Sequence, residues 1–350
     1  MLAKRQRIYY FCGEIYYFCG ESNVNMDKDK IQKTKVMITG ASGFLGSRLA
    51  YYYGERYELL LPTHSELNVC REEAVRAYLE LHRPEVVIHC AALSNTWYCE
   101  QHPEESHRVN VQGTVRLAKA CKLTGARLLF MSSDQVYNGT PLLGPLREEV
   151  MLQPVNVYGR HKLEAEQRVQ CNLPDAVGLR LTWMYDLPGH APRPCKPLMQ
   201  DRSLTQDRSL TQDIPLKLNS NILVNLRRAA SEGTPLQAAT HEYRGVTNVW
   251  EVVRHLEQAI ALPGGIYNFG SGNTLDSLTL YRRIAREMGS ADPSALVLPD
   301  EERYSQQPRN LTMDCTLIGR YGIRFNDSLQ GVREALAYGA NSNNDKGLPR

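Results

Sequence analysis

The spacing of hydrophobic positions predicts strands and helices that alternate along most of the chain. Short continuous apolar runs fit strands that are buried on both faces of a parallel sheet. Such runs occupy residues 35–39, 57–61, 86–90, 127–132 and 176–183. Between them, apolar residues recur every three or four positions, which predicts helices through Leu45, Leu49 and Tyr53 and over residues 71–81, 104–124 and 158–170. This alternation predicts an α/β fold with a doubly wound parallel sheet.

The second half of the chain has a different pattern, which predicts a smaller unit. Residues 186–215 are rich in Pro, Gly and polar side chains and are expected to form a loop. Helical spacing returns at residues 222–231, 249–261 and 278–288, with short strand-like pieces between these segments. We therefore expect a first domain over residues 31–185. A smaller C-terminal α/β cap is expected over residues 186–338. Whether some strands of this region join the main sheet stays open.

Two tandem duplications and both ends of the chain lie outside this pattern. The sequence IYYFCGE occupies residues 8–14 and again 15–21, and QDRSLT occupies residues 200–205 and again 206–211. Two copies of such short units are too few for a solenoid. Residues 1–30 are expected to form a disordered leader, and the polar residues 339–350 a disordered tail.

Composition excludes several classes of protein. The 350 residues are 42% hydrophobic and 23% charged, and the formal net charge of +3 excludes a strongly basic nucleic-acid binder. No apolar stretch reaches the length of about 18 residues that a membrane span needs. Nine cysteines without a CxxC pair form neither a disulfide framework nor a zinc site, and the histidine spacings match no usual ligand set. We expect a cytoplasmic protein with reduced thiols and no metal site.

A glycine-rich turn directly follows the first predicted strand and opens the first helix. Its residues are Gly40, Ala41, Ser42, Gly43, Phe44, Leu45 and Gly46. The first glycine permits a tight turn, the second lets a pyrophosphate approach the backbone, and the third lets the helix pack closely on the strand. Backbone amides at the start of the helix would face the phosphates. The turn therefore predicts a Rossmann-type NAD(P)-binding domain, and its GxxGxxG spacing is typical of short-chain dehydrogenase/reductases.

The second predicted strand bears on the choice of cofactor. An acidic residue at its end would bind the ribose hydroxyls of NAD, but the first acid after Leu61 is Glu66. Arg48 and His64 are candidate partners for the 2′-phosphate of NADP, although an arginine on a helix face is more often solvated. NADP(H) is therefore slightly preferred, and NAD(H) stays open.

Three further residues make up a candidate catalytic set. Tyr158 and Lys162 are four residues apart and share one face of a predicted helix. An ammonium group near a phenol stabilises the phenolate and lowers the pKa of the tyrosine, as a proton donor to a carbonyl oxygen requires. Ser133 lies at the carboxyl end of a predicted strand, the edge at which ligands bind in this class of fold. Its hydroxyl could hydrogen-bond the reacting oxygen beside the tyrosine.

Four stretches extend this picture to a known family. Residues 132–139 (SSDQVYNG) are similar to STDYVFDG, 154–164 (PVNVYGRHKLE) to PLNVYGxTKLxGE, 179–185 (LRLTWMY) to LRTSWVY, and 307–314 (QPRNLTMD) to RPxNSxLD. Those motifs belong to the dTDP-4-dehydrorhamnose reductase group of the extended short-chain dehydrogenase/reductases. The chain resembles this group over about residues 34–338. The group also contains the regulatory β subunit of methionine adenosyltransferase.

The resemblance implies roles for individual residues. Tyr158 would be the acid, Lys162 its tuning cation and a ribose ligand, and Ser133 the third catalytic hydroxyl. The residues along the cofactor would be Gly43, Phe44 and Leu45 at the pyrophosphate, Asn68 and Val69 near the adenine, and Ala92, Leu93 and Ser94 further along. The sugar would face Ser133, Asp134 and Trp183 beneath a substrate-binding cap, although a tryptophan after a strand is often a core residue.

Several residues depart from the pattern of the group. Trp97 and Asn68 stand where aspartate is frequent, and residues 241–247 (HEYRGVT) replace DQxGxPT, so the sugar itself stays open. Gln135 stands where related sugar-nucleotide dehydratases carry a glutamate, and a glutamine cannot serve as their acid/base. A dehydratase is therefore disfavoured.

The expected function is NAD(P)H-dependent reduction of the C4 ketone of a nucleotide-activated 4-keto-6-deoxysugar, with Tyr158 as the proton donor. Two alternatives stay open. One is a non-catalytic NADP-binding regulatory subunit, and the other is an NAD-dependent sugar-nucleotide epimerase with no net cofactor consumption. The expected partner is the nucleotide sugar, without nucleic acid or membrane, and a homodimer stays open.

Overall fold

A computed structural model describes residues 9–11, 14–16, 33–187, 191, 216–217 and 219–344. Within the predicted leader, β1 (Tyr9–Phe11) and β2 (Glu14–Tyr16) pair as a short antiparallel ladder. The duplication at residues 200–211 and most of the loop predicted at 186–215 lie outside the described residues.

The apolar runs form a parallel sheet of six strands. These are β3 (Lys35–Thr39), β4 (Glu58–Leu60), β5 (Val86–His89), β6 (Arg127–Ser133), β7 (Val177–Leu181) and β12 (Gly265–Phe269). Their spatial order is β12-β7-β6-β5-β3-β4, and each neighbouring pair is parallel. The chain winds one way from β3 to β4 and the other way from β5 onward, so the connections that follow β3 and β5 run to opposite sides. In this class of fold, ligands bind in the crevice between two such connections. The predicted doubly wound fold is confirmed.

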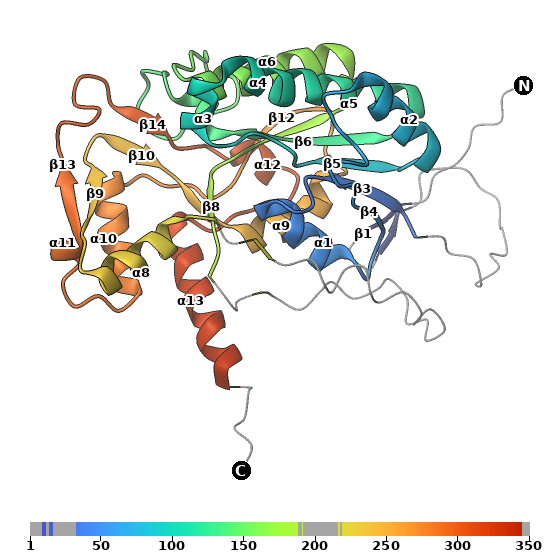
Figure 1. Ribbon diagram of the computed structural model, residues 1–350. Helices are drawn as coiled ribbons and strands as arrows, with labels where there is room; N and C mark the ends of the chain where they lie inside the picture. Colours follow the sequence, from blue (N-terminus) through green and yellow to red (C-terminus); the bar gives the residue numbers. More distant parts are fainter. Residues whose placement is uncertain are drawn as a thin grey trace, which may run out of the picture.

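Helices cover both faces of this sheet (Figure 1). One face carries α2 (Glu72–His82), α5 (Thr114–Thr124) and α6 (Val157–Asn172), and the other carries α1 (Phe44–Tyr53) and α9 (Val249–Ala259). Three short helical segments precede α5: α3 (Thr96–Gln101), α4 (Pro103–Ser106) and the π-helix η1 (His107–Gly113). Because both faces are covered, the strands are buried on both sides, which explains their continuous apolar sequences.

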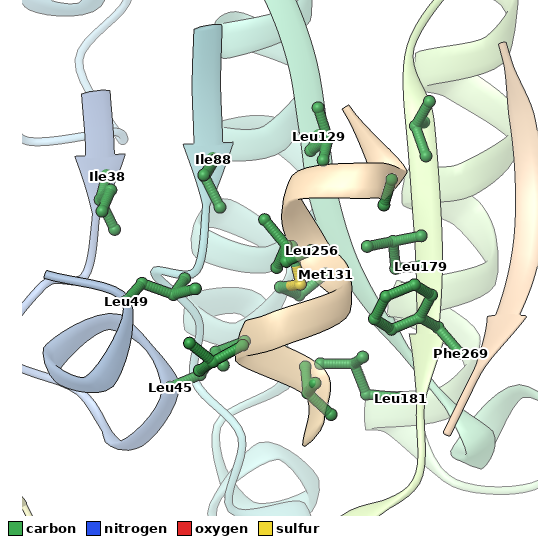
Figure 2. Packing of buried hydrophobic residues seen from close by; sticks show 14 of the residues in the cluster. Ile38, Leu45, Leu49, Ile88, Leu129, Met131, Leu179, Leu181, Leu256 and Phe269 are labelled. Carbon is green, nitrogen blue, oxygen red and sulfur yellow. The ribbon is translucent and has the colours of Figure 1, made fainter. Parts of the chain in front are cut away.

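The core on the α1 side draws on both halves of the sequence. Figure 2 shows Ile38, Ile88 and Leu129 of the sheet facing Leu49 of α1 and Leu256 of α9. Each of these side chains is buried, with an exposed fraction of 1% or less. Burial of one such side chain stabilises the fold by about 1.5–3 kcal/mol. Residues from beyond position 185 therefore complete the core of the main sheet.

The remaining elements form a smaller α/β cap beside the carboxyl edge of the sheet (Figure 1). Its strands pair in parallel twos: β8 (Trp183–Tyr185) with β11 (Val246–Asn248), β9 (Leu236–Ala239) with β13 (Val297–Asp300), and β10 (Glu242–Arg244) with β14 (Arg309–Leu311). Its helices are α8 (Ile222–Glu232), α10 (Ser277–Glu287), α11 (Pro293–Leu296) and α13 (Ser328–Asn344), while α12 (Thr316–Gly319) lies against β12. A separate core that includes Leu223, Leu280 and Val297 holds the cap together.

Two predicted elements differ from the structure. The helix expected at residues 104–124 is interrupted by η1. In this π-helix the hydrogen bonds join residues five apart, which breaks the regular α-helical pattern. The tail expected from residue 339 begins inside α13, which continues to Asn344. Polar side chains are compatible with a helix, so polarity alone did not mark where this helix ends.

Candidate active site

The glycine-rich turn lies between β3 and α1 at the crevice. Gly40 has a φ of 69°, which glycine adopts without strain, and a Cβ there would lie 2.7 Å from the amide nitrogen of Ala91. Gly43 is the N-cap of α1 and has no side chain to cap it, so backbone amides of the first turn are available to a ligand. Ser42 is exposed beside them, and Phe44 and Leu45 are buried in that turn. This arrangement suits an anion such as a phosphate.

The third glycine of the turn determines how closely α1 approaches β3. A Cβ at Gly46 would collide with the carbonyl oxygen of Gly40, a backbone atom that cannot move aside cheaply. We expect Gly46→Ala to lower the free energy of unfolding by about 1–3 kcal/mol, the usual cost of overpacking. Urea denaturation measures this change. Gly319→Ala is the control, since a Cβ at Gly319 meets no atom within 4 Å among the described residues, and an equal loss in both variants would contradict the explanation.

The segment after β5 borders the other side of the crevice. It contains the predicted residues Ala92, Leu93 and Ser94, and Asn110 fixes it from η1. The Asn110 side chain accepts a hydrogen bond from the Leu93 amide at 3.0 Å and donates one to the Leu93 carbonyl at 2.9 Å. Asn110 was missed in the sequence analysis. A polar residue on the buried side of a predicted helix was the available signal.

Asn68 and Val69 lie on the loop that follows β4, on the same edge of the sheet. The Asn68 side chain accepts a hydrogen bond from the amide of Cys70 at 2.9 Å, which shapes this loop. Val69 is buried and lies against Gly113, where a Cβ would stand 3.0 Å from the valine methyl group. The loop is therefore held against the η1–α5 junction, and both residues border the crevice.

Arg48 is not available to a 2′-phosphate, so that part of the cofactor prediction is wrong. Its side chain is fully buried, and both Nε and Nη2 donate to the Asp186 carboxylate, at 2.8 and 2.6 Å. The guanidinium also lies over the rings of Phe44 and Trp250. A helix face that the sequence pattern treats as solvated is covered here by the start of the cap. The other candidate, His64, is exposed on the loop after β4.

The structure brings Ser133, Tyr158 and Lys162 together at the end of β6. Asn156 accepts a hydrogen bond from the amide of Gly159 and thereby starts α6, so Tyr158 lies in the first turn and Lys162 one turn later. Ser133 ends β6, and its hydroxyl is a hydrogen-bond neighbour of the Tyr158 phenol. Lys162 donates from Nζ to the carbonyl of Met131 at 2.8 Å and lies 5.6 Å from the centre of the Tyr158 ring.

The neighbouring Ser132 has a structural role, which distinguishes it from Ser133. Its hydroxyl donates to Glu166 at 2.5 Å, and Glu166 also binds Arg180 through two hydrogen bonds of 2.9 and 2.7 Å. These two charged side chains are only 3–4% exposed. A buried pair with both oxygens satisfied fixes the end of β6 against α6 and β7. Ser133 lies on the opposite face of β6 and takes no part in this pair, so its hydroxyl belongs to the candidate site.

Burial dominates the electrostatics of this set. It lowers the pKa of Lys162 to about 8, although Cys99 and Glu166 oppose the change. Burial also raises the pKa of Tyr158 well above its usual value, and the charge of Asp134 adds to this effect. The sequence analysis expected Lys162 to lower the pKa of the tyrosine. In the structure the ammonium lies beside the ring, and desolvation raises the pKa of the phenol instead.

Asp134 is enclosed between the sheet and the cap. Its Oδ1 accepts hydrogen bonds from the Ser133 hydroxyl at 3.1 Å and from the Gln135 side chain at 3.3 Å. Its Oδ2 pairs with Arg244 of β10 at 3.3 Å. The Arg244 guanidinium carbon lies 4.9 Å from the centre of the Trp183 ring. The two predicted sugar-facing residues, Asp134 and Trp183, are thus joined by an arginine that the sequence analysis left without a role.

A second arginine makes a parallel bridge from the cap. Arg309 of β14 donates to the Gln135 side-chain oxygen at 2.7 Å and pairs with Glu242 at 2.9 Å. It also donates to the Tyr304 hydroxyl at 2.8 Å. Residues Glu242 and Arg309 are direct partners in the β10–β14 ladder, so one small sheet presents both arginines to the 3₁₀ turn η2 (Asp134–Tyr137).

Within the described residues, no group of three His, Cys, Asp or Glu side chains could hold a metal ion. No helix in the same part of the chain is long and apolar enough to cross a membrane.

Comparison with known proteins shows which family the chain resembles. The family model described as RmlD substrate binding domain matches residues 34–207. The dTDP-4-dehydrorhamnose reductase of Mycolicibacterium smegmatis is 36% identical over 156 residues, which are 44% of this chain and 47% of that protein. The chain thus matches about half the length of this curated relative, and the resemblance inferred from the sequence motifs is confirmed.

Two longer matches extend the comparison beyond residue 207. The bovine methionine adenosyltransferase 2 subunit beta is 26% identical over 324 residues, which are 87% of this chain and 88% of that protein. The crystal structure of dTDP-4-dehydrorhamnose reductase from Bacillus anthracis in complex with NADP has a TM-score of 0.70 and 20% identity, and it covers 87% of this chain and 99% of that one. At this identity the structural match shows that the RmlD family and this chain share the fold, cap included.

Proposed function

We propose that the protein reduces the C4 ketone of a nucleotide-activated 4-keto-6-deoxysugar with NADPH. The observation that carries the proposal is the convergence of Ser133, Tyr158 and Lys162 at the carboxyl edge of the sheet, beside a glycine turn suited to phosphate. A hydroxyl, a phenol and an ammonium in this relation can protonate and orient a carbonyl oxygen. The family of residues 34–207 and the reductase among its relatives support the same reaction.

The residues of the crevice fit a dinucleotide. Backbone amides after Gly43 would hold the pyrophosphate, and the loops that carry Asn68–Val69 and Ala92–Ser94 would flank the adenosine and nicotinamide ends. The bound cofactor would supply the hydride. Lys162, beside Tyr158 and anchored on the Met131 carbonyl, would hold the nicotinamide ribose. NADPH is the proposed form because no carboxylate occurs between Leu61 and Glu66, and Glu66 is engaged by the Thr63 amide and hydroxyl at 2.8 Å each.

The proton would come from Tyr158. Its raised pKa keeps the phenol protonated at neutral pH, so Tyr158 carries the proton before the substrate binds. The Ser133 hydroxyl, next to the phenol, would take part in the hydrogen bonding of the ketone oxygen. Asp134 and Trp183 would line the sugar side of the site, with the two cap arginines above them.

The test is a direct assay of cofactor oxidation. Purified protein is incubated with dTDP-4-dehydro-6-deoxy sugars and NADPH, and the loss of reduced cofactor is followed by absorbance while the sugar product is identified by mass spectrometry. We expect stoichiometric NADPH consumption and gain of two hydrogens in the sugar. Absence of turnover with every such sugar, with either NADPH or NADH, would defeat the proposal.

The pH dependence provides a more specific prediction. Because burial lowers the pKa of Lys162 to about 8, its ammonium loses the proton as pH rises through about 8. The cationic form is needed at the ribose and beside the phenol. We therefore expect kcat/KM to be level below this pH and to fall about tenfold per pH unit above it. A profile of kcat/KM from pH 6 to about 10 measures it, and a flat profile across this range would contradict the role given to Lys162.

A second candidate function is a cofactor-binding regulatory subunit. It is favoured by the match to methionine adenosyltransferase 2 subunit beta, which spans 87% of this chain. Fold and a retained tyrosine do not distinguish the two functions. A protein that binds NADPH, reduces none of the sugars and co-purifies with a synthetase would support this second candidate and count against the reductase.

A further inference from the structure

Arg244 occupies an unusual position between the cap and the catalytic set. It lies on β10 of the cap, and its side chain is only 15% exposed. One face of the guanidinium lies near Trp183, while Nη2 reaches Asp134 across the junction. The backbone carbonyl of Arg244 accepts a hydrogen bond of 2.8 Å from Asn273, which fixes the strand. The buried Nε finds no hydrogen-bond partner among the described residues, so this arginine is held mainly by Trp183 and Asp134.

A hydrogen-bond chain leads from this arginine to the phenol. Asp134 accepts a hydrogen bond from the Ser133 hydroxyl at 3.1 Å. The Ser133 hydroxyl is also a hydrogen-bond neighbour of the Tyr158 phenol, and the charge of Asp134 raises the pKa of that phenol. A carboxylate that is 2% exposed interacts strongly with its neighbours, because little water screens it. The charge state and position of Asp134 are therefore felt at Tyr158 through one hydroxyl.

We propose that Arg244 of the cap is a positioning residue that sets how readily the proton donor Tyr158 gives up its proton, acting through Asp134 and Ser133. The guanidinium neutralises Asp134, and the phenol gives up its proton more easily. Without this positive charge, the unpaired carboxylate would hold the phenol proton more strongly. This inference rests on the proposed function for its role in turnover, while the electrostatic coupling itself needs no substrate.

Other charged and titratable groups surround Asp134, Tyr158 and Arg244. Asp134 also feels Arg309 of β14, and burial raises its pKa against both arginines. Tyr158 faces Cys99 of α3 and lies beside Lys162 on α6. Arg244 faces Glu242 on its own strand and Tyr281 of α10. Of the two arginines, Arg244 is the one that bonds to the carboxylate directly, since Arg309 bonds to Gln135 and Glu242.

The test measures the titration of Tyr158 without any substrate. A difluorotyrosine, whose phenol is intrinsically much more acidic than that of tyrosine, is incorporated at position 158 and titrated by ¹⁹F NMR in the full chain. We expect Arg244→Gln to raise the pKa of this phenol by about one unit, and Asp134→Asn to lower it by a similar amount. In the Asp134→Asn background, Arg244→Gln should have little further effect. Arg244→Lys, which keeps the charge, should restore most of the shift.

The control is Arg333→Gln, which removes the same charge from the cap at a half-exposed pair with Glu287. It should leave the titration unchanged. An Arg244→Gln variant that titrates like the unmodified chain, or a control that shifts it equally, would overturn the proposal. If Arg244→Gln does not fold, as judged by circular dichroism, Asp134→Asn still tests the link from Asp134 to Tyr158. An unchanged phenol pKa in Asp134→Asn would overturn the proposal.

The kinetic measurement separates this inference from the proposed function. If the protein reduces a sugar, Arg244→Gln should lower kcat by up to about tenfold, the factor that corresponds to one pKa unit. A titration shift without any turnover would defeat the reductase and leave the coupling intact. Turnover with no titration shift would defeat the coupling and leave the reductase intact.

Discussion

Tyr158→Phe is expected to lower kcat for ketone reduction by about 10²–10⁴-fold, the range typical of a lost general acid. The phenol is the group beside Ser133 that can deliver a proton to an oxygen bound at the end of β6. Phenylalanine keeps the ring, which is buried against Val157 and Cys99, so the packing of α6 should be preserved. The measurement is kcat under saturating substrate and NADPH.

Binding provides the control for this variant. NADPH affinity, followed by cofactor fluorescence, should change little, because the proposed ribose ligand Lys162 and the glycine turn are untouched. A matched variant, Tyr78→Phe, removes a phenol from α2 on the surface away from the site and should keep full activity. Retention of more than about a tenth of kcat in Tyr158→Phe would contradict the assignment of the acid.

Arg48→Met is expected to lower the free energy of unfolding by about 3–5 kcal/mol. The substitution leaves the Asp186 carboxylate buried with only neutral donors: the Trp250 indole at 3.0 Å and the Leu187 amide at 2.8 Å. Burial lowers the pKa of Arg48, and the charge and hydrogen bonds of Asp186 oppose this effect. Urea denaturation measures the loss.

Two further variants show whether the unpaired charge is the cause. Arg48→Met combined with Asp186→Asn should recover part of the stability, because the buried charge is gone. Arg333→Met breaks a half-exposed pair and should cost about 1 kcal/mol or less. If Arg48→Met were no more destabilising than Arg333→Met, the pair would not contribute as described.

The sheet could be predicted from the sequence because its signal is local. Each strand of the main sheet is buried on both faces, so the run Val86–His89, for example, is continuously apolar until its last residue. The turn at Gly40 and the spacing of Tyr158 and Lys162 are likewise contained in a few consecutive residues. Such patterns reflect steric and helical geometry that does not depend on the rest of the chain.

The long-range contacts between the sheet and the cap could not be predicted in the same way. Arg244 and Asp134 are 110 positions apart, and Arg48 and Asp186 are 138 positions apart. No periodicity links residues at such separations, and an arginine on a helix has the same sequence pattern whether water or a cap covers it. The direction of the Tyr158 pKa also depended on burial, which is a property of the assembled fold.

The path of the chain limits how this protein can be divided into fragments that fold alone. β12 and α9 come from beyond the first domain, yet β12 pairs along β7 over residues 265–269 and α9 packs on the sheet. A fragment that stopped at residue 185 would expose the full edge of β7 and leave Leu129 and Leu179 without their cover. Exposed, flat apolar edges recruit other strands. The fragment that ends at residue 185 is therefore expected to aggregate when it is produced alone. The two parts of the chain are expected to fold and unfold together.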